Sequence, residues 1–196
     1  MQNRFFLVTA FFLGVILTDI PPATASAVKV NDGFKAARRI QSRYFDICIE
    51  SGVDEDSLAM RLSVPASIRT IVRKAVSTSY DVPSQMDMLY LAVSEILDIH
   101  LTDFTCTVKI CRDRKSLSRI AMNLFGQRMS AGGFYIATID TLYVDAENVS
   151  LNILGHEMGH AIQTHYFVVP PPVKVQEVLS GYVEYQLRKY TNTLPE

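Results

Sequence analysis

The clearest hydrophobic pattern in the chain runs through residues 151–166, where apolar side chains recur at the spacing of an α-helix. At about 100° per residue, His156 and His160 lie together on one side of this helix, with Glu157 between them and the apolar stripe. The pattern predicts a helix with one core face and a separate polar face. The predicted core face consists of Leu151, Leu154, Met158, Ala161 and Ile162.

A second helical pattern covers residues 173–190, after three consecutive prolines that end the first helix. The face opposite its predicted core stripe includes two small residues, Ser180 and Gly181, which would let two helices approach closely. We therefore expect this helix to return across the helix of residues 151–166. Its predicted core stripe is Val175, Val178, Leu179, Tyr182 and Gln186, and its opposite face is Glu177, Ser180, Gly181, Glu184 and Arg188.

The chain before residue 151 shows helical patterns first and β patterns later. Asp32 is expected to cap the first helix, and Ser84 with Asp87 resembles an acidic capping box before the fourth. The sequence therefore predicts an α+β domain that is mostly helical, with a small antiparallel sheet before residues 151–166. The predicted helices are 33–49, 54–62, 65–77, 88–97 and 115–125; residues 102–112 form a strand, and residues 134–145 form a hairpin after Gly132 and Gly133.

Residues 1–27 have the order of a secretory signal peptide. Arg4 gives a short positive region, an apolar run follows at residues 5–17, and small residues alternate at positions 23–27. Removing 27 residues from 196 leaves 169, which is enough for the single domain predicted at 28–196. We expect an exported protein, periplasmic or secreted, without stable membrane association after cleavage. The alternative is an uncleaved N-terminal anchor.

Charge and cysteine content limit the possible binding functions and disulfide bonds. The formal net charge is −1 and the pI is near 6.4, so no basic surface indicates nucleic-acid binding. The chain has three cysteines, an odd number for an oxidising compartment. Assigned to the core sides of their predicted elements, Cys48 and Cys106 would pair and leave Cys111 free. Three free thiols remain the alternative.

His156-Glu157-Met158-Gly159-His160 forms an H-E-x-x-H motif on the predicted polar face. Residues four apart share one helix face, so both imidazoles can reach one zinc ion at about 2.0–2.1 Å. Glu157 would stand beside the ion as general base for a water that zinc activates. The pattern therefore predicts one Zn²⁺ per chain; the alternative is a solvated polar face.

The third metal ligand is expected from the helix of residues 173–190. Because the prolines turn the chain soon after His160, the first turns of that helix should lie closest, which favours Glu177 over Glu184. His165 falls on the apolar stripe and is expected to be a core histidine with a satisfied ring. The longer metzincin motif is absent, since it requires Gly at Gln163 and His at Tyr166.

HEMGH followed by a helix with an acid resembles the gluzincin group of zinc metallopeptidases. Residues 134–190 are similar to small exported bacterial zincin-like proteins, which implies a minimal zincin-like fold and ligands His156, His160 and Glu177. One departure concerns Gly181, where the thermolysin-like pattern has an Asp that supports a ligand histidine. Glu184 could take that role.

These features together predict a zinc metallopeptidase that acts on a peptide or protein substrate. An extended peptide could add to the edge strand expected at residues 134–137. Tyr182 or Tyr185 is the nearest tyrosine for stabilising an oxyanion. The alternatives are a secreted zinc-scaffold binding domain without activity and a hydrolase of cell-wall peptides or amides. The sequence does not indicate an oligomeric state.

Overall fold

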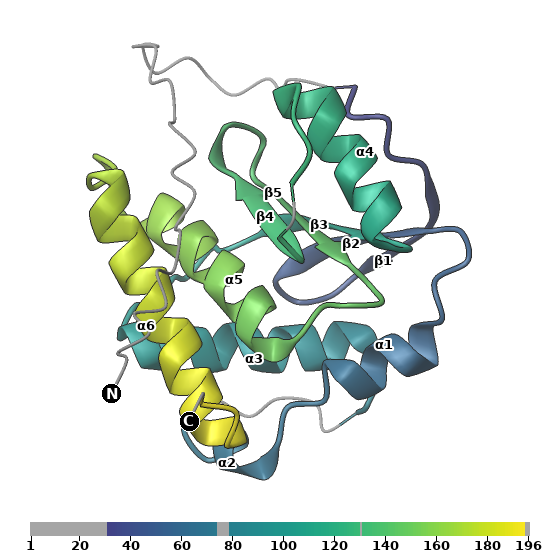
Figure 1. Cartoon of the computed structure of the whole chain (residues 1–196). Coiled ribbons are helices and arrows are strands. Elements are labelled where there is room, and N and C mark those ends of the chain that lie inside the picture. Colours follow the sequence, from purple (N-terminus) through teal and green to yellow (C-terminus); the bar gives the residue numbers. More distant parts are fainter. Residues whose placement is uncertain (1–30, 74–78, 130, 195–196) are drawn as a thin grey trace, which may run out of the picture.

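The computed structural model describes residues 31–73, 79–129 and 131–194 (Figure 1). The signal peptide predicted at residues 1–27 lies outside the described residues. Within the described ranges the α+β prediction is confirmed, with a five-stranded sheet and six α-helices. No helix in these ranges is both long and apolar enough to cross a membrane.

The sheet is mixed, so the prediction of an antiparallel sheet is wrong. The two outer pairs are antiparallel, whereas β3 runs parallel to both β2 and β5. Three helices separate β2 from β3, and such a long connection lets two neighbouring strands run in the same direction. The strand order is β1-β2-β3-β5-β4, with β1 at Ala36–Gln41, β2 at Phe45–Glu50, β3 at Cys106–Cys111, β4 at Gly133–Ile136 and β5 at Thr141–Asp145.

The helix predicted at residues 33–49 is wrong, because this stretch forms the β1–β2 hairpin. In β2 the buried residues Phe45, Ile47 and Ile49 alternate along the strand, which is the period of two of a β-strand. Ile40, Tyr44 and Ile47 also fit a helical spacing, and that coincidence misled the prediction. Asp32 caps no helix here and instead bonds the side chains of Lys109 and Tyr143.

The other predicted helices are present with changed ends. The helix expected at residues 65–77 is a short helix, and residues 74–78 lie outside the described part of the chain. The fourth helix begins earlier than expected because Asp81, and not Ser84, caps it. Asp87 instead accepts hydrogen bonds from the Ser42 hydroxyl and the Arg43 backbone in the β1–β2 turn. The helices are α1 at Glu55–Arg61, α2 at Ala66–Arg69, α3 at Val82–Leu97, α4 at Arg114–Phe125, α5 at Leu151–Tyr166 and α6 at Val173–Thr191.

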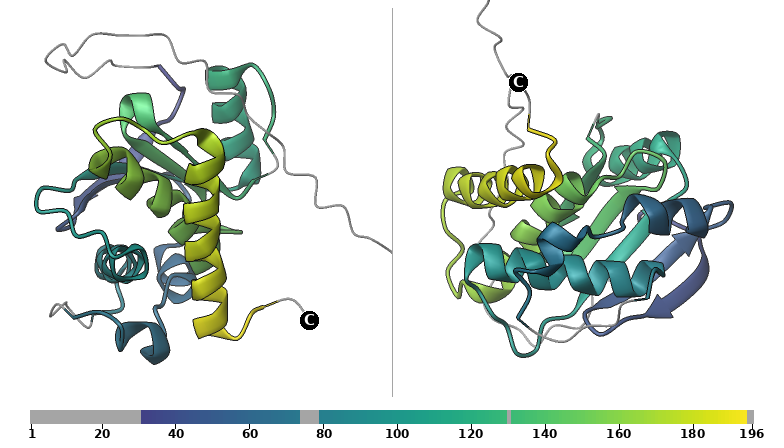
Figure 2. Two further views of the ribbon diagram at one scale, coloured as in Figure 1. Left: turned by 90° about the vertical axis from the view of Figure 1, so that its left-hand side faces the viewer. Right: turned by 90° about the horizontal axis from the view of Figure 1, so that it is seen from below.

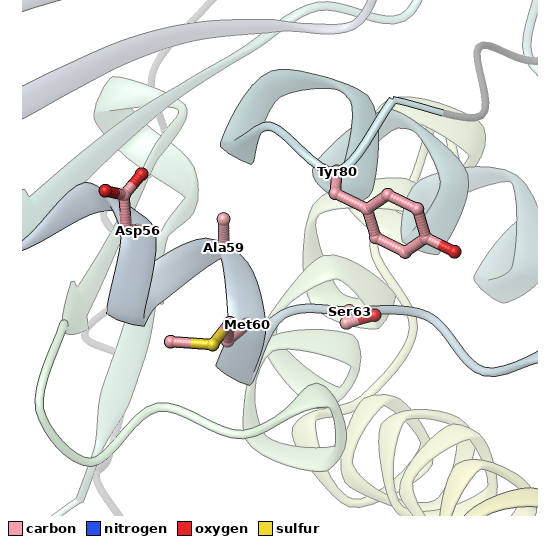
Figure 3. A pocket seen from close by; sticks show the side chains of 5 residues that line it. All are labelled: Asp56, Ala59, Met60, Ser63 and Tyr80. Atoms are coloured by element: carbon pink, nitrogen blue, oxygen red, sulfur yellow. The ribbon is translucent and has the colours of Figure 1, made fainter.

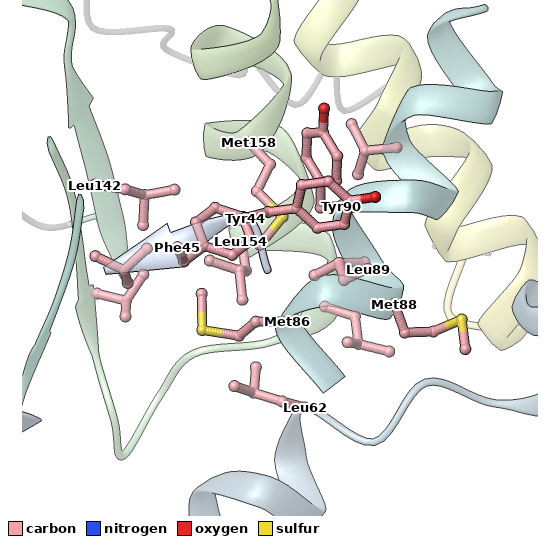
Figure 4. Close-up of a cluster of buried hydrophobic side chains, with 14 of the residues drawn as sticks. Tyr44, Phe45, Leu62, Met86, Met88, Leu89, Tyr90, Leu142, Leu154 and Met158 are labelled. Carbon is pink, nitrogen blue, oxygen red and sulfur yellow. The ribbon is translucent and has the colours of Figure 1, made fainter. Parts of the chain in front are cut away.

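Each face of the sheet carries its own hydrophobic cluster. On one face α3 and α5 pack against the strands, and Figure 4 shows Tyr90 of α3, Leu142 of β5 and Met158 of α5 meeting there. On the other face α4 packs against the sheet through a smaller cluster that includes Tyr143. Figures 1 and 2 show α4 on the opposite side of the sheet from α3. Buried side chains on both faces hold β5, the strand before α5, in place.

The cysteine prediction is wrong, because Cys48, Cys106 and Cys111 are all free and buried. In the parallel β2–β3 pair, Cys48 lies opposite Lys109 and Cys106 lies opposite Phe45. The two sulfurs are therefore three positions apart along the strands and on opposite faces of the sheet. Burial raises the pKa of the Cys106 and Cys111 thiols, which keeps them protonated.

Candidate metal centre

Helix α5 is positioned by its buried stripe, as the hydrophobic pattern predicts. The side chain of Ser150 caps the helix by accepting a hydrogen bond from the Ile153 backbone. All five predicted stripe residues are buried, which confirms the core face of α5: Leu151, Leu154, Met158, Ala161 and Ile162. With this stripe on the core, His156 and His160 are carried on a different side of the helix.

Helix α6 crosses α5 at close range. A Cβ atom on Gly155 would lie 2.1 Å from Leu187 Cδ1, and one on Gly159 would lie 3.0 Å from Ser180 Oγ. The close approach of the two helices therefore depends on glycines in α5. Sequence reasoning placed the small residues only in α6, but nothing lies within 4 Å of a Cβ on Gly181. Glycines four apart in the motif helix were the available signal.

The predicted core face of α6 is wrong. Val175, Val178 and Tyr182 are 44%, 64% and 47% exposed, whereas the buried residues of α6 are Ser180, Val183 and Leu187. The physical reason is the close crossing of α5 and α6. A close crossing favours the α6 face with the small residue Ser180 at its centre over the face with the larger apolar side chains. The same rotation directs Glu177 and Glu184 towards α5.

Gln163 links α5 and α6 by hydrogen bonds beside their crossing. This buried side chain donates through Nε2 to the Gly159 carbonyl (3.1 Å), the Ser180 hydroxyl (3.0 Å) and the Gln176 carbonyl (3.3 Å). The last bond holds the residue immediately before Glu177. Sequence reasoning considered Gln163 only as a departure from the metzincin motif and so missed this contact.

The structure brings together the three residues that the sequence analysis proposes as ligands. His156 Nε2 and His160 Nε2 are 3.2 Å apart, and Glu177 oxygens lie 3.6 Å and 3.5 Å from these two nitrogens. Bonds of about 2.0–2.1 Å to a tetrahedral zinc ion place ligand atoms roughly 3.4 Å from one another. The donor set and its spacing therefore fit a zinc ion. Of the described residues, these three form a cluster that could hold a metal.

The electrostatics of the cluster also suit a cation. Burial and the neighbouring His156 lower the pKa of His160 to about 4, so its imidazole is neutral at pH 7 and can act as a ligand. Burial and the nearby Glu177 carboxylate raise the pKa of Glu157 to about 8. A cation beside Glu157 would favour its charged form, since opposite charges lower a carboxyl pKa.

Glu184 stands behind His156 on the side away from Glu177. Its Oε2 lies 3.5 Å from His156 Nδ1, while its Oε1 accepts two hydrogen bonds from Arg188, at 2.8 Å and 3.0 Å. His156 Nδ1 is buried and has no hydrogen-bond partner among the described residues. Glu184 thus lies close enough to Nδ1 to be a candidate for orienting this ring, which is the role that the sequence suggests for it.

β4 is the edge strand of the sheet and packs beside α5. Asp145 N–H bonds the Gly132 carbonyl, so in this antiparallel pair Gly132, Phe134 and Ile136 face β5 and Tyr135 N–H faces the open edge. The outer side of β4, next to α5, is therefore an open strand edge.

Other predicted residues lie outside the cluster. His165 is not a core residue, because its side chain is 26% exposed, but its ring is satisfied by a 3.0 Å contact with Asp140. Tyr182 lies about 140° around α6 from Glu177, and Tyr185 is half-exposed. Within the described part of the chain, no hydrogen bond or ring contact joins either tyrosine to His156, His160 or Glu177.

Two surface hollows lie elsewhere. One of about 440 Å³ is lined by residues of α1, by Ser63 after it and by Tyr80 before α3 (Figure 3). The other, of about 500 Å³, lies between the segment after α2, the end of α3 and α6. Neither is lined by the histidines or by Glu177. The donor atoms of the cluster, and not the size of a hollow, identify the candidate site.

Comparison of the chain with protein-family models, with curated proteins and with solved structures gives no match. The functional argument therefore depends on the geometry of α5, α6 and β4.

Proposed function

We propose that the protein is an exported zinc metallopeptidase in which His156, His160 and Glu177 hold one zinc ion and Glu157 is the general base. The observation that carries this proposal is the near-tetrahedral spacing of the two imidazole nitrogens and the Glu177 oxygens. A solvated polar face would not bring two imidazole rings and a carboxylate together across two helices. This spacing also supports Glu177, and not Glu184, as the third ligand.

When bound, zinc lowers the pKa of a water molecule to about 7 and polarises the scissile carbonyl. Glu157 accepts a proton from the attacking water at its carboxylate and later delivers that proton to the leaving amine. Glu184 orients the His156 ring through Nδ1.

An extended peptide is the substrate class that the surroundings favour. β4 is the edge strand next to α5, and backbone groups of alternate β4 residues face away from β5. A peptide can add to such an edge through backbone hydrogen bonds. Export is proposed from the order of charged, apolar and small residues at positions 1–27.

The test of this function is the Glu157→Gln variant, assayed with a fluorescence-quenched peptide library and with peptidoglycan fragments. Hydrolysis should fall by about 10²–10⁴-fold, because the amide cannot accept the proton. Zinc content should stay near one per chain, since Glu157 is not a ligand. Glu147→Gln, the same change at an exposed position, is the matched control and should change nothing.

The outcome also separates the alternatives. If the protein binds zinc through His156 but cleaves nothing, the zinc site is a scaffold and the peptidase proposal is wrong. If only peptidoglycan fragments are cleaved, the substrate is a cell-wall amide. If Glu157→Gln loses zinc as readily as His156→Ala, the division of roles between base and ligand is wrong.

A further inference from the structure

Exposed apolar side chains gather on α6 and at its two ends. Among the described residues, eleven large hydrophobic side chains are exposed, and eight of these lie within residues 166–194. Soluble monomers rarely expose a contiguous apolar patch larger than a few hundred Å², and a larger patch indicates an interaction surface. The concentration of these side chains on one helix therefore points to a partner that covers it.

Four of the exposed side chains form one stripe along α6. Val175, Val178, Tyr182 and Tyr185 follow one another at intervals of three, four and three residues and fall within about 80° around the helix. The opposite side of α6 packs on α5, and Figures 1 and 2 show α6 on the outside of the molecule. The stripe therefore has the spacing of a packed helix face but is exposed.

The stripe is complementary to a second copy of itself. Val175 and Tyr185 are each five residues from position 180, and Val178 and Tyr182 are each two residues from it. When two α6 helices lie antiparallel with a two-fold axis at this position, Val178 faces Tyr182 of the second copy and Val175 faces Tyr185. Each contact then joins a small apolar side chain to a large one, which is the alternation with which helix faces interdigitate. A parallel pair would place Tyr against Tyr and Val against Val.

The charged residues of α6 fit the same antiparallel arrangement. About the axis at position 180, Lys174 lies opposite Gln186, and Glu184 lies opposite Gln176. Each of the other charged positions of α6 also lies opposite an uncharged residue. In a parallel pair every charge would lie beside its own copy, and like charges at close range repel one another. The charge pattern therefore favours the antiparallel pair.

We propose that the α6 stripe is an interface between two copies of this chain, paired antiparallel about position 180. The stripe includes three of the five residues that the sequence pattern predicts as the core face of α6, and the pair buries them. A contact of this kind uses the same patch on both copies and closes after two chains. Glu177 lies about 120° around α6 from the middle of the stripe, so the candidate metal ligands stay outside the interface. The inference is independent of the proposed function.

Analytical ultracentrifugation of the purified protein tests the pairing. A single pair of helices buries less than the standard interface of about 1,600 Å², so the dissociation constant should be about 1–100 µM. Val178→Asp places two carboxylates in the apolar contact of each dimer and should raise this constant at least about 100-fold. Because Val178 is exposed in one copy, the circular dichroism of the variant should match that of the wild type. Met122→Asp, at an exposed apolar position of α4, is the matched control and should leave association unchanged.

Disulfide trapping tests the geometry of the pair. Val178→Cys mixed with Tyr182→Cys should form a cross-linked dimer on oxidation faster than either variant alone, because these positions face each other only in the antiparallel pair. Native Cys48, Cys106 and Cys111 are buried and should not react. Met122→Cys in place of Tyr182→Cys is the control and should give little mixed dimer. Faster cross-linking of Val178→Cys alone than of the mixture would overturn the antiparallel arrangement.

Other outcomes would overturn the interface itself. A protein that sediments as a monomer at every concentration up to about 300 µM does not pair through this stripe. Equal association of the wild type and Val178→Asp would place any dimer contact elsewhere. If a monomeric wild type binds vesicles of phosphatidylcholine and phosphatidylglycerol and Val178→Asp does not, the stripe is a membrane-binding surface and the dimer proposal is wrong.

Discussion

Two polar clusters on opposite sides of the sheet contrast in how completely their groups are paired. Beside α4, the buried Asp32 carboxylate accepts hydrogen bonds from Lys109 Nζ, from the Tyr143 hydroxyl at 2.5 Å and from the Phe34 backbone at 2.9 Å. An acid, a base and a phenol complement one another there. Between α5 and α6, two imidazole nitrogens lie 3.2 Å apart beside carboxylates, and His156 Nδ1 is buried without a hydrogen-bond partner among the described residues.

The contrast separates a structural cluster from a candidate binding site. A fully paired buried cluster fixes one arrangement of the chain, since loss of one partner leaves the other buried and uncompensated. Two imidazole rings and the Glu177 carboxylate direct their donor atoms at one point, where a positive charge would complement them. The Asp32 cluster has its charges and hydrogen bonds paired within the protein, whereas the cluster between α5 and α6 would be complemented by a cation.

The largest expected effect is a loss of stability when the cluster of Asp32, Lys109 and Tyr143 is broken. Lys109→Met leaves the Asp32 carboxylate, which is 6% exposed, without its cation and should lower the free energy of unfolding by about 3–5 kcal/mol. Urea denaturation measures this loss. Lys115→Met, at an exposed position of α4, is the control, and its free energy of unfolding should stay within about 0.5 kcal/mol of the wild type. A Lys109→Met protein as stable as the control would show that the cluster contributes little.

Zinc should stabilise the protein only through the cluster of His156, His160 and Glu177. At a free zinc concentration of 1,000 times Kd, the wild type should gain about 4 kcal/mol of stability. Lys109→Met should gain the same amount, because its metal ligands are unchanged, whereas His160→Ala should gain almost nothing. Thermal unfolding with and without zinc measures these gains. An equal gain in His160→Ala would place the metal elsewhere.

The two glutamates of α6 should differ in a chelator competition titration. Glu184→Ala should weaken zinc binding about 10–100-fold, because it removes only the group behind His156 Nδ1. Glu177→Ala should weaken binding further, since it removes a ligand oxygen next to both Nε2 atoms. The opposite order of the two losses would exchange the two roles.

The smallest effect concerns pH. Burial alone would raise the pKa of Asp32, but hydrogen bonds from Lys109, Tyr143 and Phe34 outweigh it and lower this pKa below 3.8. The resulting stability is present above the pKa of the unfolded chain and is lost as pH falls through the folded pKa. Below pH 4 the wild type should therefore lose stability faster than Asp32→Asn, by at most about 1.4 kcal/mol per pH unit. Denaturation at pH 2–5 measures the two slopes, and parallel slopes would contradict the prediction.

Sequence periodicity predicted α5 well because its apolar spacing is strict and its length favours a helix. It predicted the extent of α6 but the wrong buried face, because periodicity does not show which side a close crossing selects. Residues 33–49 fitted both periods, and only the pairing of β2 with β3 decides between them.

The candidate site was predictable to the same extent. His156, Glu157 and His160 lie on one helix, so spacing alone grouped them, and the proline turn favoured Glu177. Asp140 and Gln163 could not be found in this way. Their contacts depend on the register of β4 with β5 and on the distance between two helices, which only the three-dimensional structure supplies.

The chain separations within the two clusters bear on how the protein folds. Asp32 and Tyr143 are 111 residues apart, whereas His156 and Glu177 are 21 apart and belong to consecutive helices. Loop closure costs about 0.6 kcal/mol for each doubling of length, so the helix pair closes at an entropic cost lower by roughly 1.5 kcal/mol. Local contacts of this kind also form faster than distant ones. The α5–α6 hairpin can therefore collect its histidines and Glu177 before the Asp32 segment reaches the sheet.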